Sequence, residues 1–207
     1  MKSNRKKLPF HNYSLLGIVR LIRDLIYTKL FYTKSRIIRI PFYIRGKSYV
    51  DLGIFLTTGV GVRIDAFPKN NSKSKILKFG SHIQINDYVH IAAIESIEIG
   101  NHVLIASKVF ITDHNHGYYG SEFQADSPLS IPVERQEPSK PVIIRDKVWI
   151  GEHVCILPGV TIGEGSIIGA MSVVNKNIPP HSIAAGSPAK VIKKYNFETL
   201  IWEKVER

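Results

Sequence analysis

A six-residue repeat of aliphatic side chains constrains this 207-residue chain more than any other feature of its sequence. Between residues 144 and 174 an aliphatic side chain occupies every sixth position, namely Ile144, Ile150, Ile156, Ile162, Ile168 and Val174. An α-helix repeats about every 3.6 residues and a simple strand every second residue, so neither element explains this period. Glycine follows three of these positions, at Gly151, Gly163 and Gly169. The pattern is typical of a hexapeptide β-helix, in which every sixth side chain points into the core.

The six-residue step also organises the chain before residue 144. It is kept first at Val50, Leu56 and Val62, and then at Phe79, Ile85, Ile91 and Ile97. The step then slips by two residues and resumes at Ile99, Ile105 and Ile111, which predicts a local bulge. The polar segment at residues 68–75 predicts a surface excursion. We therefore expect coils stacked about 4.8 Å apart over residues 44–194.

The positive charge is confined to the first part of the chain. The formal net charge is +11, and residues 1–47 carry 12 lysines and arginines against the single acid Asp24. The remaining 160 residues carry 16 basic and 16 acidic side chains, so their charges balance. A β-helix that bound nucleic acid would need its own basic stripe, so we expect no nucleic-acid partner.

Residues 1–43 predict a basic extension that contains one amphipathic helix. From Tyr13 to about Leu30, apolar residues fall on one helical face, at Leu15, Ile18, Val19, Ile22, Leu25 and Ile26. In one interpretation this face packs on the open end of the β-helix and covers its strand edges. In the other, it lies on an anionic membrane through residues 1–39, which would place the protein peripherally at the inner face of that membrane. Both interpretations can hold together.

The cysteine content and the apolar runs set an expectation for the compartment. Cys155 is the only cysteine and cannot form an internal disulfide, which favours a reducing environment. No apolar run approaches the roughly 18 residues of a transmembrane helix. Arg20, Arg23 and Asp24 interrupt the apolar N-terminal stretch, unlike in a signal peptide. The sequence therefore predicts a cytoplasmic protein.

The repeat stops at Thr112 and leaves a long loop at residues 113–141. This loop contains His114, His116 and four prolines, and it has no six-residue pattern. Long unpatterned loops in a regular fold commonly carry function. After the repeats end near residue 194, a helical pattern over residues 195–207 predicts a short C-terminal helix that closes the far end of the solenoid.

Taken together, these motifs resemble the hexapeptide-repeat acyltransferases. The resemblance rests on the repeats, on the loop opening ITDHNHG at residues 111–117 and on the ending GSPAKVIKK at residues 186–194. It is strongest for the sugar O-acetyltransferases of bacterial surface-polysaccharide pathways, akin to the maltose and galactoside acetyltransferases. It implies an all-β fold, a left-handed parallel β-helix, assembled as a homotrimer with active sites between subunits. It also implies acetyl-CoA as the acyl donor, a sugar or glycan as the acceptor, and no metal.

The resemblance implies roles for residues near the loop. A hydroxyl is a weak nucleophile at neutral pH, and a neutral imidazole suits the role of its general base. His116 lies five residues after Ile111, the offset of the catalytic histidine in the resembling enzymes, so we assign it as the base. His114 is the alternative base, and Asp113 either orients an imidazole or caps the turn. Asn86 matches an asparagine that contacts the acceptor sugar, and transfer is expected to be direct, without an acyl-enzyme.

The resemblance also implies a CoA site in the late coils. Gly151 and Ala170 would let the pantetheine arm approach the backbone, and Trp149 would form a wall of its groove. Lys190 and Lys193 replace arginines of the galactoside enzyme and would meet the phosphates of CoA as point charges.

Three other functions fit part of the sequence. An N-acetyltransferase acting on a nucleotide-linked amino sugar would use the same fold and the same histidine. A protein resembling the γ-type carbonic anhydrases would bind zinc through three histidines, but spacing places no third histidine beside His114 and His116. A binding scaffold would not need a histidine loop joined to the SPAK ending.

Overall fold

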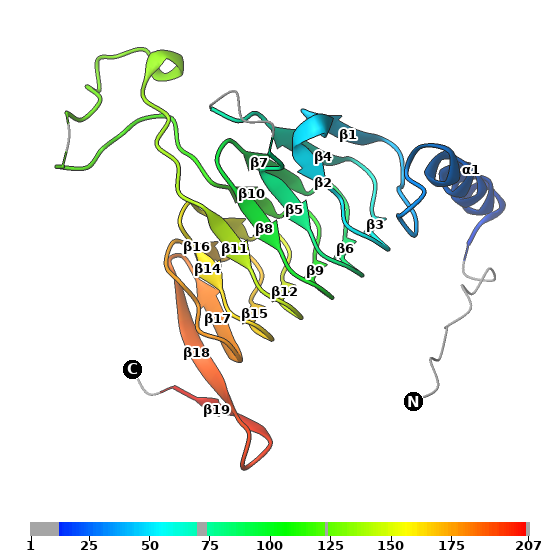
Figure 1. Cartoon of the computed structure of the whole chain (residues 1–207). Helices are drawn as coiled ribbons and strands as arrows, with labels where there is room; N and C mark the ends of the chain where they lie inside the picture. Colours follow the sequence, from blue (N-terminus) through cyan, green and yellow to red (C-terminus); the bar gives the residue numbers. More distant parts are fainter. Residues whose placement is uncertain (1–12, 70–73, 123, 206–207) are drawn as a thin grey trace.

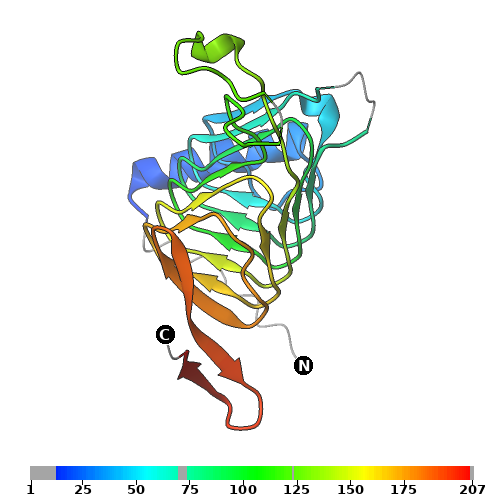
Figure 2. The same cartoon turned by 90° about the vertical axis from the view of Figure 1, so that its left-hand side faces the viewer.

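The computed structural model describes residues 13–69, 74–122 and 124–205. Three sheets, in which the strands of successive coils pair in parallel, form the faces of a prism, and the chain passes from one sheet to the next in every coil (Figure 1). The fold is a left-handed parallel β-helix, which confirms the predicted class. Viewed from the side, the coils stack along one axis, and the loop at residues 113–141 projects from the body (Figure 2).

The strands of the coils are short, and each sheet collects one strand from each coil; sheet 3 also contains the C-terminal strands β18 and β19. Sheet 1 consists of β1 (Phe42–Arg45), β4 (Val62–Ala66), β7 (His90–Ala93), β10 (Phe110–Thr112), β13 (Cys155–Ile156) and β16 (Val173–Val174). Sheet 2 consists of β2 (Val50–Asp51), β5 (Leu77–Phe79), β8 (Ile97–Ile99), β11 (Val142–Ile144) and β14 (Thr161–Ile162). Sheet 3 consists of β3 (Thr57–Thr58), β6 (Gln84–Ile85), β9 (Leu104–Ile105), β12 (Trp149–Ile150), β15 (Ile167–Ile168), β17 (Ser182–Gly186), β18 (Ala189–Asn196) and β19 (Ile201–Lys204). Two single-turn 3₁₀ helices, η2 (Lys47–Tyr49) and η3 (Pro132–Glu134), lie outside the sheets.

The core is a ladder of stacked aliphatic residues, most of them at the predicted positions. In sheet 1, Ile91 lies beside Ile64 on one side and Ile111 on the other, and all three are fully buried. In sheet 3, Ile150 lies between Ile105 and Ile168 in the same way. From Phe79 onward the predicted positions therefore place one aliphatic side chain per strand on the axis. In the first coils the equivalent positions are Thr58 and Ile64, two residues after the predicted Leu56 and Val62, which are also buried.

Departures from this period gather at the corner where the chain passes from sheet 1 to sheet 2. From Ile91 in β7 to the equivalent Ile99 in β8 the step is eight residues, and the next passage contains the loop at residues 113–141. Strand β8 pairs with β5 and β11 in continuous register, so the predicted bulge is wrong. The two extra residues lie instead in the turn at residues 94–96.

Helix α1 (Leu15–Phe31) packs beside the first coil, as one interpretation of the sequence predicted (Figure 1). Its side toward the solenoid buries Leu21, Asp24 and Thr28. The Thr28 hydroxyl accepts the backbone N–H of Ile38 at 2.8 Å, which fixes the helix to the start of the first coil. The predicted basic segment at residues 1–12 lies outside the described residues.

The apolar face of α1 points away from the solenoid, so the helix lies where the first interpretation placed it but does not pack through this face. We call this surface the outer face of α1; its members are 50–81% exposed and comprise Leu15, Val19, Ile22, Ile26 and Leu30. Polar contacts of Asp24 and Thr28 hold the helix against the first coil. The spacing of apolar residues, from which the packed face was predicted, contains no information about these contacts. Within the described ranges, no helix is long and apolar enough to cross a membrane.

The predicted C-terminal helix is wrong, because this segment forms an antiparallel hairpin of β18 and β19 at the edge of sheet 3. Tyr195 and Trp202 pair across the hairpin with ring centroids 5.3 Å apart. The side-chain oxygen of Asn196 accepts the backbone N–H of Glu198 and so stabilises the turn. Aromatic cross-strand pairing and this turn outweigh the helical spacing of the apolar residues.

Candidate active site

A groove of about 740 Å³ lies on sheet 1 beside the base of the loop at residues 113–141. Its polar lining residues come from four strands, the segment after β4 and the loop, and they include Arg45, Arg63, Asp65, Lys69, His90, Thr112, His114, His116 and Glu137. A hollow of similar volume, about 750 Å³, lies near residues 177–181 and contains none of the predicted site residues. The groove on sheet 1 is therefore the candidate active site.

Asp113 is the most strongly held polar residue of this region and is fully buried. Its carboxylate accepts the backbone N–H groups of Ile94, Glu95 and Ser96 at 2.8–3.1 Å. These three donors form the turn that contains the two extra residues. Burial acts to raise the pKa of Asp113, but the hydrogen bonds from His114 and from the three amides outweigh it and lower the pKa.

His114 is oriented by Asp113. Its Nδ1 lies 2.9 Å from Oδ1 of Asp113 and 3.1 Å from the hydroxyl of Thr112. Because the carboxylate can only accept, Nδ1 carries the proton and Nε2 is left as a proton acceptor. The side chain is 16% exposed, so the ring is held by protein while remaining accessible from the groove. A buried carboxylate paired with such an imidazole is the arrangement of a general base.

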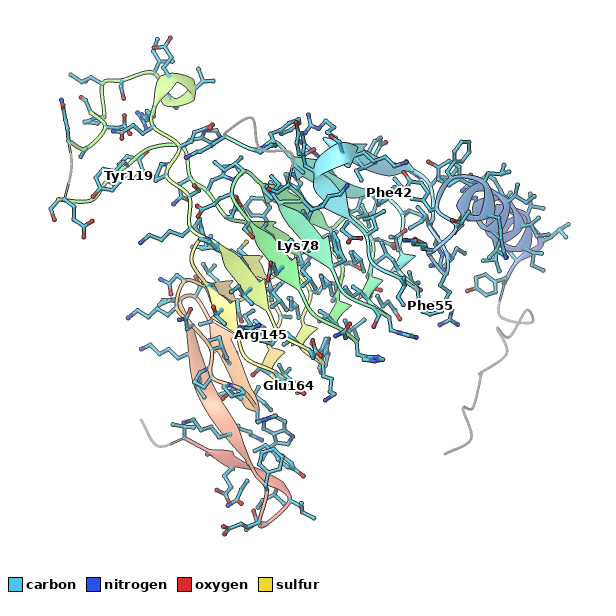
Figure 3. All side chains as sticks on the ribbon, viewed as in Figure 1. Phe42, Phe55, Lys78, Tyr119, Arg145 and Glu164 are labelled. Atoms are coloured by element: carbon cyan, nitrogen blue, oxygen red, sulfur yellow. The ribbon has the colours of Figure 1, made fainter. Side chains whose placement is uncertain are left out.

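His116 lies farther out, and its ring centroid is 6.1 Å from that of His114. Its side chain is 60% exposed, and Nδ1 lies 3.3 Å from a carboxylate oxygen of Glu137, which is itself exposed. The hydroxyl of Tyr119 donates to the backbone carbonyl of His116 at 2.8 Å. Figure 3 shows Tyr119 on the projecting loop, away from the sheets. His116 therefore lines the same groove but is held less firmly than His114.

The base of the loop is closed by backbone hydrogen bonds. The N–H of Lys140 donates to the carbonyl of Asp113 at 2.8 Å, and the N–H of Gly117 donates to that of Gln136 at 2.7 Å. His114 and Ser139 form an antiparallel bridge between these two contacts. These contacts hold the two ends of the loop together, so the backbone that carries His114 and His116 is fixed at the corner between sheets 1 and 2.

The predicted acceptor and CoA residues lie at a different corner, where the chain passes from sheet 3 to sheet 1. Asn86 follows β6, Gly151 follows β12 and Ala170 follows β15, so they stack along one edge. A Cβ built on Gly151 would lie 2.7 Å from the backbone nitrogen of Ala170, so the coils approach too closely there for a larger residue. Trp149 is 48% exposed on the outer face of β12, beside this edge.

Of the two predicted lysines, Lys190 lies nearer this edge. It pairs with Ala185, whose Cβ lies 2.9 Å from a Cβ built on Gly169. Lys193 pairs with Ile183 farther along β17. The structure therefore brings the predicted CoA residues together, and it separates them and Asn86 from the histidines of the same chain.

Four residues of the groove were missed by the sequence analysis: Arg45, Arg63, Asp65 and His90. The carboxylate of Asp65 accepts from the other three at 2.5–3.0 Å. They are 20 to 25 residues apart or on alternate positions of one strand, so their contacts depend on coil register rather than on a local motif. Among the described residues, no group of three or more His, Cys, Asp and Glu side chains is placed to hold a metal ion.

A left-handed β-helix with a histidine loop of this kind defines a hexapeptide-repeat transferase. A family model for the bacterial transferase hexapeptide (six repeats) matches residues 141–176. The chain is also 50% identical over 192 residues, covering 93% of it and 95% of the relative, to a putative lipopolysaccharide biosynthesis O-acetyl transferase, WbbJ, of Escherichia coli (strain K12). The chain therefore belongs to the hexapeptide-repeat transferase family.

Two solved structures are similar in fold. A maltose O-acetyltransferase from Clostridium difficile 630 is 26% identical, with a TM-score of 0.53, and the match covers 87% of this chain and 89% of that one. AntD, an N-acyltransferase from Bacillus cereus solved with dTDP and 3-hydroxybutyryl-CoA, has a TM-score of 0.66 at 21% identity, and the match covers 84% and 90% of the two chains. At that identity the second likeness supports the fold alone.

Proposed function

We propose that this chain is an acetyl-CoA-dependent O-acetyltransferase that modifies a sugar hydroxyl of a bacterial surface polysaccharide or of its precursor. The observation that carries the proposal is the His114–Asp113 pair in the groove of a hexapeptide-repeat fold. The choice of a glycan acceptor is supported by the 50% identical relative, whose name is putative lipopolysaccharide biosynthesis O-acetyl transferase. We propose that the reaction takes place on the cytoplasmic side of the membrane.

In the proposed reaction, Nε2 of His114 takes the proton from the sugar hydroxyl as its oxygen attacks the thioester carbonyl of acetyl-CoA. The tetrahedral intermediate then expels the CoA thiolate, which receives the proton from the imidazolium. Asp113 stays ionised and stabilises the imidazolium without taking its proton. One C–O bond forms and one C–S bond breaks, with no acyl-enzyme. The counted offset favoured His116 as the base; the shorter contact and the deeper burial favour His114, and we assign His116 to the outer wall of the groove.

The proposed active site is shared between copies of the chain in a homotrimer. The histidines lie at the corner between sheets 1 and 2, whereas Asn86, Gly151 and Ala170 lie at the corner between sheets 3 and 1. An acetyl group held beside Gly151 would therefore meet the histidine of a neighbouring copy. In this arrangement Trp149 and Lys190 line the CoA groove, Lys193 extends it, and Asn86 holds the acceptor.

We further propose that the outer face of α1 rests on an anionic membrane. Five large apolar side chains are exposed on this face, and Arg20, Arg23 and Lys29 are exposed on the same helix. Residues 13–47 carry eight basic side chains against Asp24 alone, and Asp24 is buried against Arg23. Apolar insertion combined with lysine and arginine is the usual basis of peripheral binding to anionic lipid. Association of the same cationic faces in a trimer would be opposed by their charge.

The test of the reaction is acetyl-CoA consumption, followed by thiol release over a panel of sugar acceptors, beside His114→Ala and His116→Ala. We expect His114→Ala to reduce kcat by roughly 10²–10⁴-fold, as for loss of a general base, and His116→Ala to retain most of it. The reverse pattern would move the base to His116. An amino-sugar acceptor preferred over every hydroxyl would instead support an N-acetyltransferase. Failure of the wild-type chain to bind acetyl-CoA would contradict the transferase itself.

A further inference from the structure

Two arginines in the groove are held by one buried carboxylate. Arg45 donates to both oxygens of Asp65, through Nε at 2.5 Å and Nη2 at 2.7 Å, and Arg63 donates through Nε at 2.8 Å. Nε2 of His90 lies 3.0 Å from the same carboxylate. Asp65 is 5% exposed, whereas the two arginine side chains are about half exposed, at 52% and 48%. The carboxylate therefore fixes both guanidinium groups while leaving them accessible from the groove.

This wall of the groove carries excess positive charge. Arg45 and Arg63 supply two cations against the single anion Asp65, and the exposed Lys69 adds a third cation. Burial acts to raise the pKa of Asp65, but the hydrogen bonds from Arg45 and His90 and the charges of the arginines lower it to about 2. Asp65 is thus ionised under all ordinary conditions and cancels only one of the three positive charges. Glu137 also lines the groove, but it pairs with His116, whereas both arginines pair with Asp65.

The cluster lies within reach of the proposed base. Arg63 on β4 pairs with His90 on β7, and His90 pairs with Phe110 on β10, two residues before Thr112. Adjacent strands are about 4.8 Å apart, so Arg63 lies roughly 10 Å along the sheet from the strand that leads into His114. A hexose whose hydroxyl faced His114 could place a phosphate on its far side against the arginines.

We infer that the groove binds a phosphate group of the acceptor, and that Arg45 and Arg63 select a phosphate-linked sugar over a free neutral one. Guanidinium groups bind phosphate through two parallel hydrogen bonds, and arginines fixed in advance lose little side-chain freedom on binding. The inference deepens the proposed function and rests on it for the identity of the ligand as an acceptor. A nucleotide sugar and a lipid-diphosphate sugar would present the same group.

The first experiment is a calorimetric titration of the full-length protein with inorganic pyrophosphate, with and without saturating acetyl-CoA. We expect wild-type protein to bind pyrophosphate in both conditions, and Arg45→Gln and Arg63→Gln to weaken binding at least about tenfold, because each removes charge-assisted hydrogen bonds. Lys78→Gln is the matched control. Lys78 pairs with Glu98 at 2.9 Å on the outer face of sheet 2, so this variant removes one cation from an inter-coil pair outside the groove (Figure 3).

Three results of this titration would overturn the inference: unchanged binding in both arginine variants, equal loss in Lys78→Gln, or displacement of pyrophosphate by acetyl-CoA. The last would assign the arginines to the phosphates of CoA. If a glutamine variant does not fold, Arg45→Lys and Arg63→Lys keep the charge and should bind pyrophosphate at an intermediate strength. Lysine variants that bind pyrophosphate as tightly as the wild-type protein would overturn the role given to the guanidinium groups.

The second experiment compares acceptors at fixed acetyl-CoA. We expect kcat/KM for a sugar 1-phosphate to exceed that of its methyl glycoside by at least about tenfold, and Arg63→Gln to abolish this preference while leaving the KM for acetyl-CoA unchanged. A nucleoside diphosphate sugar and a polyprenyl diphosphate sugar then distinguish the two sources of the phosphate. Equal kcat/KM values for charged and neutral acceptors would overturn the inference but leave the transferase intact. If wild-type protein did not bind acetyl-CoA, the proposed transferase function would be refuted. The pyrophosphate titration would still show whether Arg45 and Arg63 bind phosphate.

Discussion

Replacing Asp113 by asparagine tests the central feature of the site. The carboxylate accepts from three backbone amides and from Nδ1 of His114. An asparagine has one acceptor oxygen, which the three amides would occupy, so its NH₂ group would face His114. The imidazole would then place its proton on Nε2 and accept through Nδ1, which removes the base from the groove. Loss of the orienting carboxylate in this way is expected to reduce kcat by roughly 10³–10⁴-fold.

The same substitution should also destabilise the fold. Asp113 is fully buried, and hydrogen bonds to a charged group contribute about 1.5–3 kcal/mol each. The amide keeps most of these contacts in weaker form, so we expect a net loss of about 3 kcal/mol, which corresponds to roughly 6–12 °C in Tm for a chain of this size. The assays are thermal unfolding and thiol release at saturating substrates. Asp113→Asn with kcat within about tenfold of wild type, or with its effect confined to KM, would refute the role given to this pair.

The pH dependence of stability gives a second measurement on this variant. The pKa of Asp113 is lower in the folded chain than in the unfolded chain, so the folded state binds its proton less readily. The resulting stabilisation is present above the ordinary carboxyl pKa of about 3.9 and is lost as the pH falls through the lowered value. Wild-type Tm should therefore fall more steeply below about pH 4 than that of Asp113→Asn. Parallel curves would show that the carboxylate is not held as described.

Three further predictions concern other parts of the molecule. Trp149→Ala should raise the KM for acetyl-CoA by about tenfold with little change in kcat, because it removes an aromatic wall of the proposed CoA groove; an unchanged KM would place CoA elsewhere. Gly163→Ala should destabilise the chain by about 1–3 kcal/mol, measured by thermal unfolding, since its Cβ would lie within 2.3 Å of the backbone nitrogen of Pro180; a neutral effect would contradict this tight stacking. Ile22→Glu should reduce sedimentation of the full chain with anionic vesicles at least about tenfold, whereas Leu129→Glu on the loop, at a residue 94% exposed, should not. If Ile22→Glu instead altered only the oligomeric state, the outer face of α1 would be an interface between copies.

The six-residue period was enough to predict the β-helix because it can be recognised by counting along the sequence alone. Each coil buries one aliphatic residue per strand, so the positions can be counted without knowing which coils are neighbours. The six-residue repeat also located the loop at residues 113–141, because the repeat stops there and a long loop without the repeat was expected to carry the functional residues. Asp113, His114 and His116 were all proposed from their place at the break, but the sequence favoured His116 as the base and the geometry of the site favours His114.

The remaining features depend on contacts between coils or on a choice of face. The Asp65 cluster joins residues of successive coils, and only the register of β1, β4 and β7 brings them together. For α1 the helix was predicted but its orientation was not, because two polar residues, Asp24 and Thr28, fix the side that faces the solenoid. At the C-terminus the helical spacing was real, but pairing with the edge strand β18 stabilised an extended conformation instead.

The two extra residues in the turn at residues 94–96 interrupt the six-residue period and also supply backbone amides that bind the carboxylate of Asp113. A regular six-residue step would leave no room for the turn whose amides bind Asp113. Deleting Glu95 and Ser96 restores that step and should retain the β-helix, because β8 already pairs in register with β5 and β11. Two of the three amide donors would be lost, so we expect kcat to fall by about 10³-fold, as for Asp113→Asn, with circular dichroism and oligomeric state unchanged. Full activity in the shortened chain, or loss of the fold, would show that the slip does not serve to position the carboxylate of Asp113.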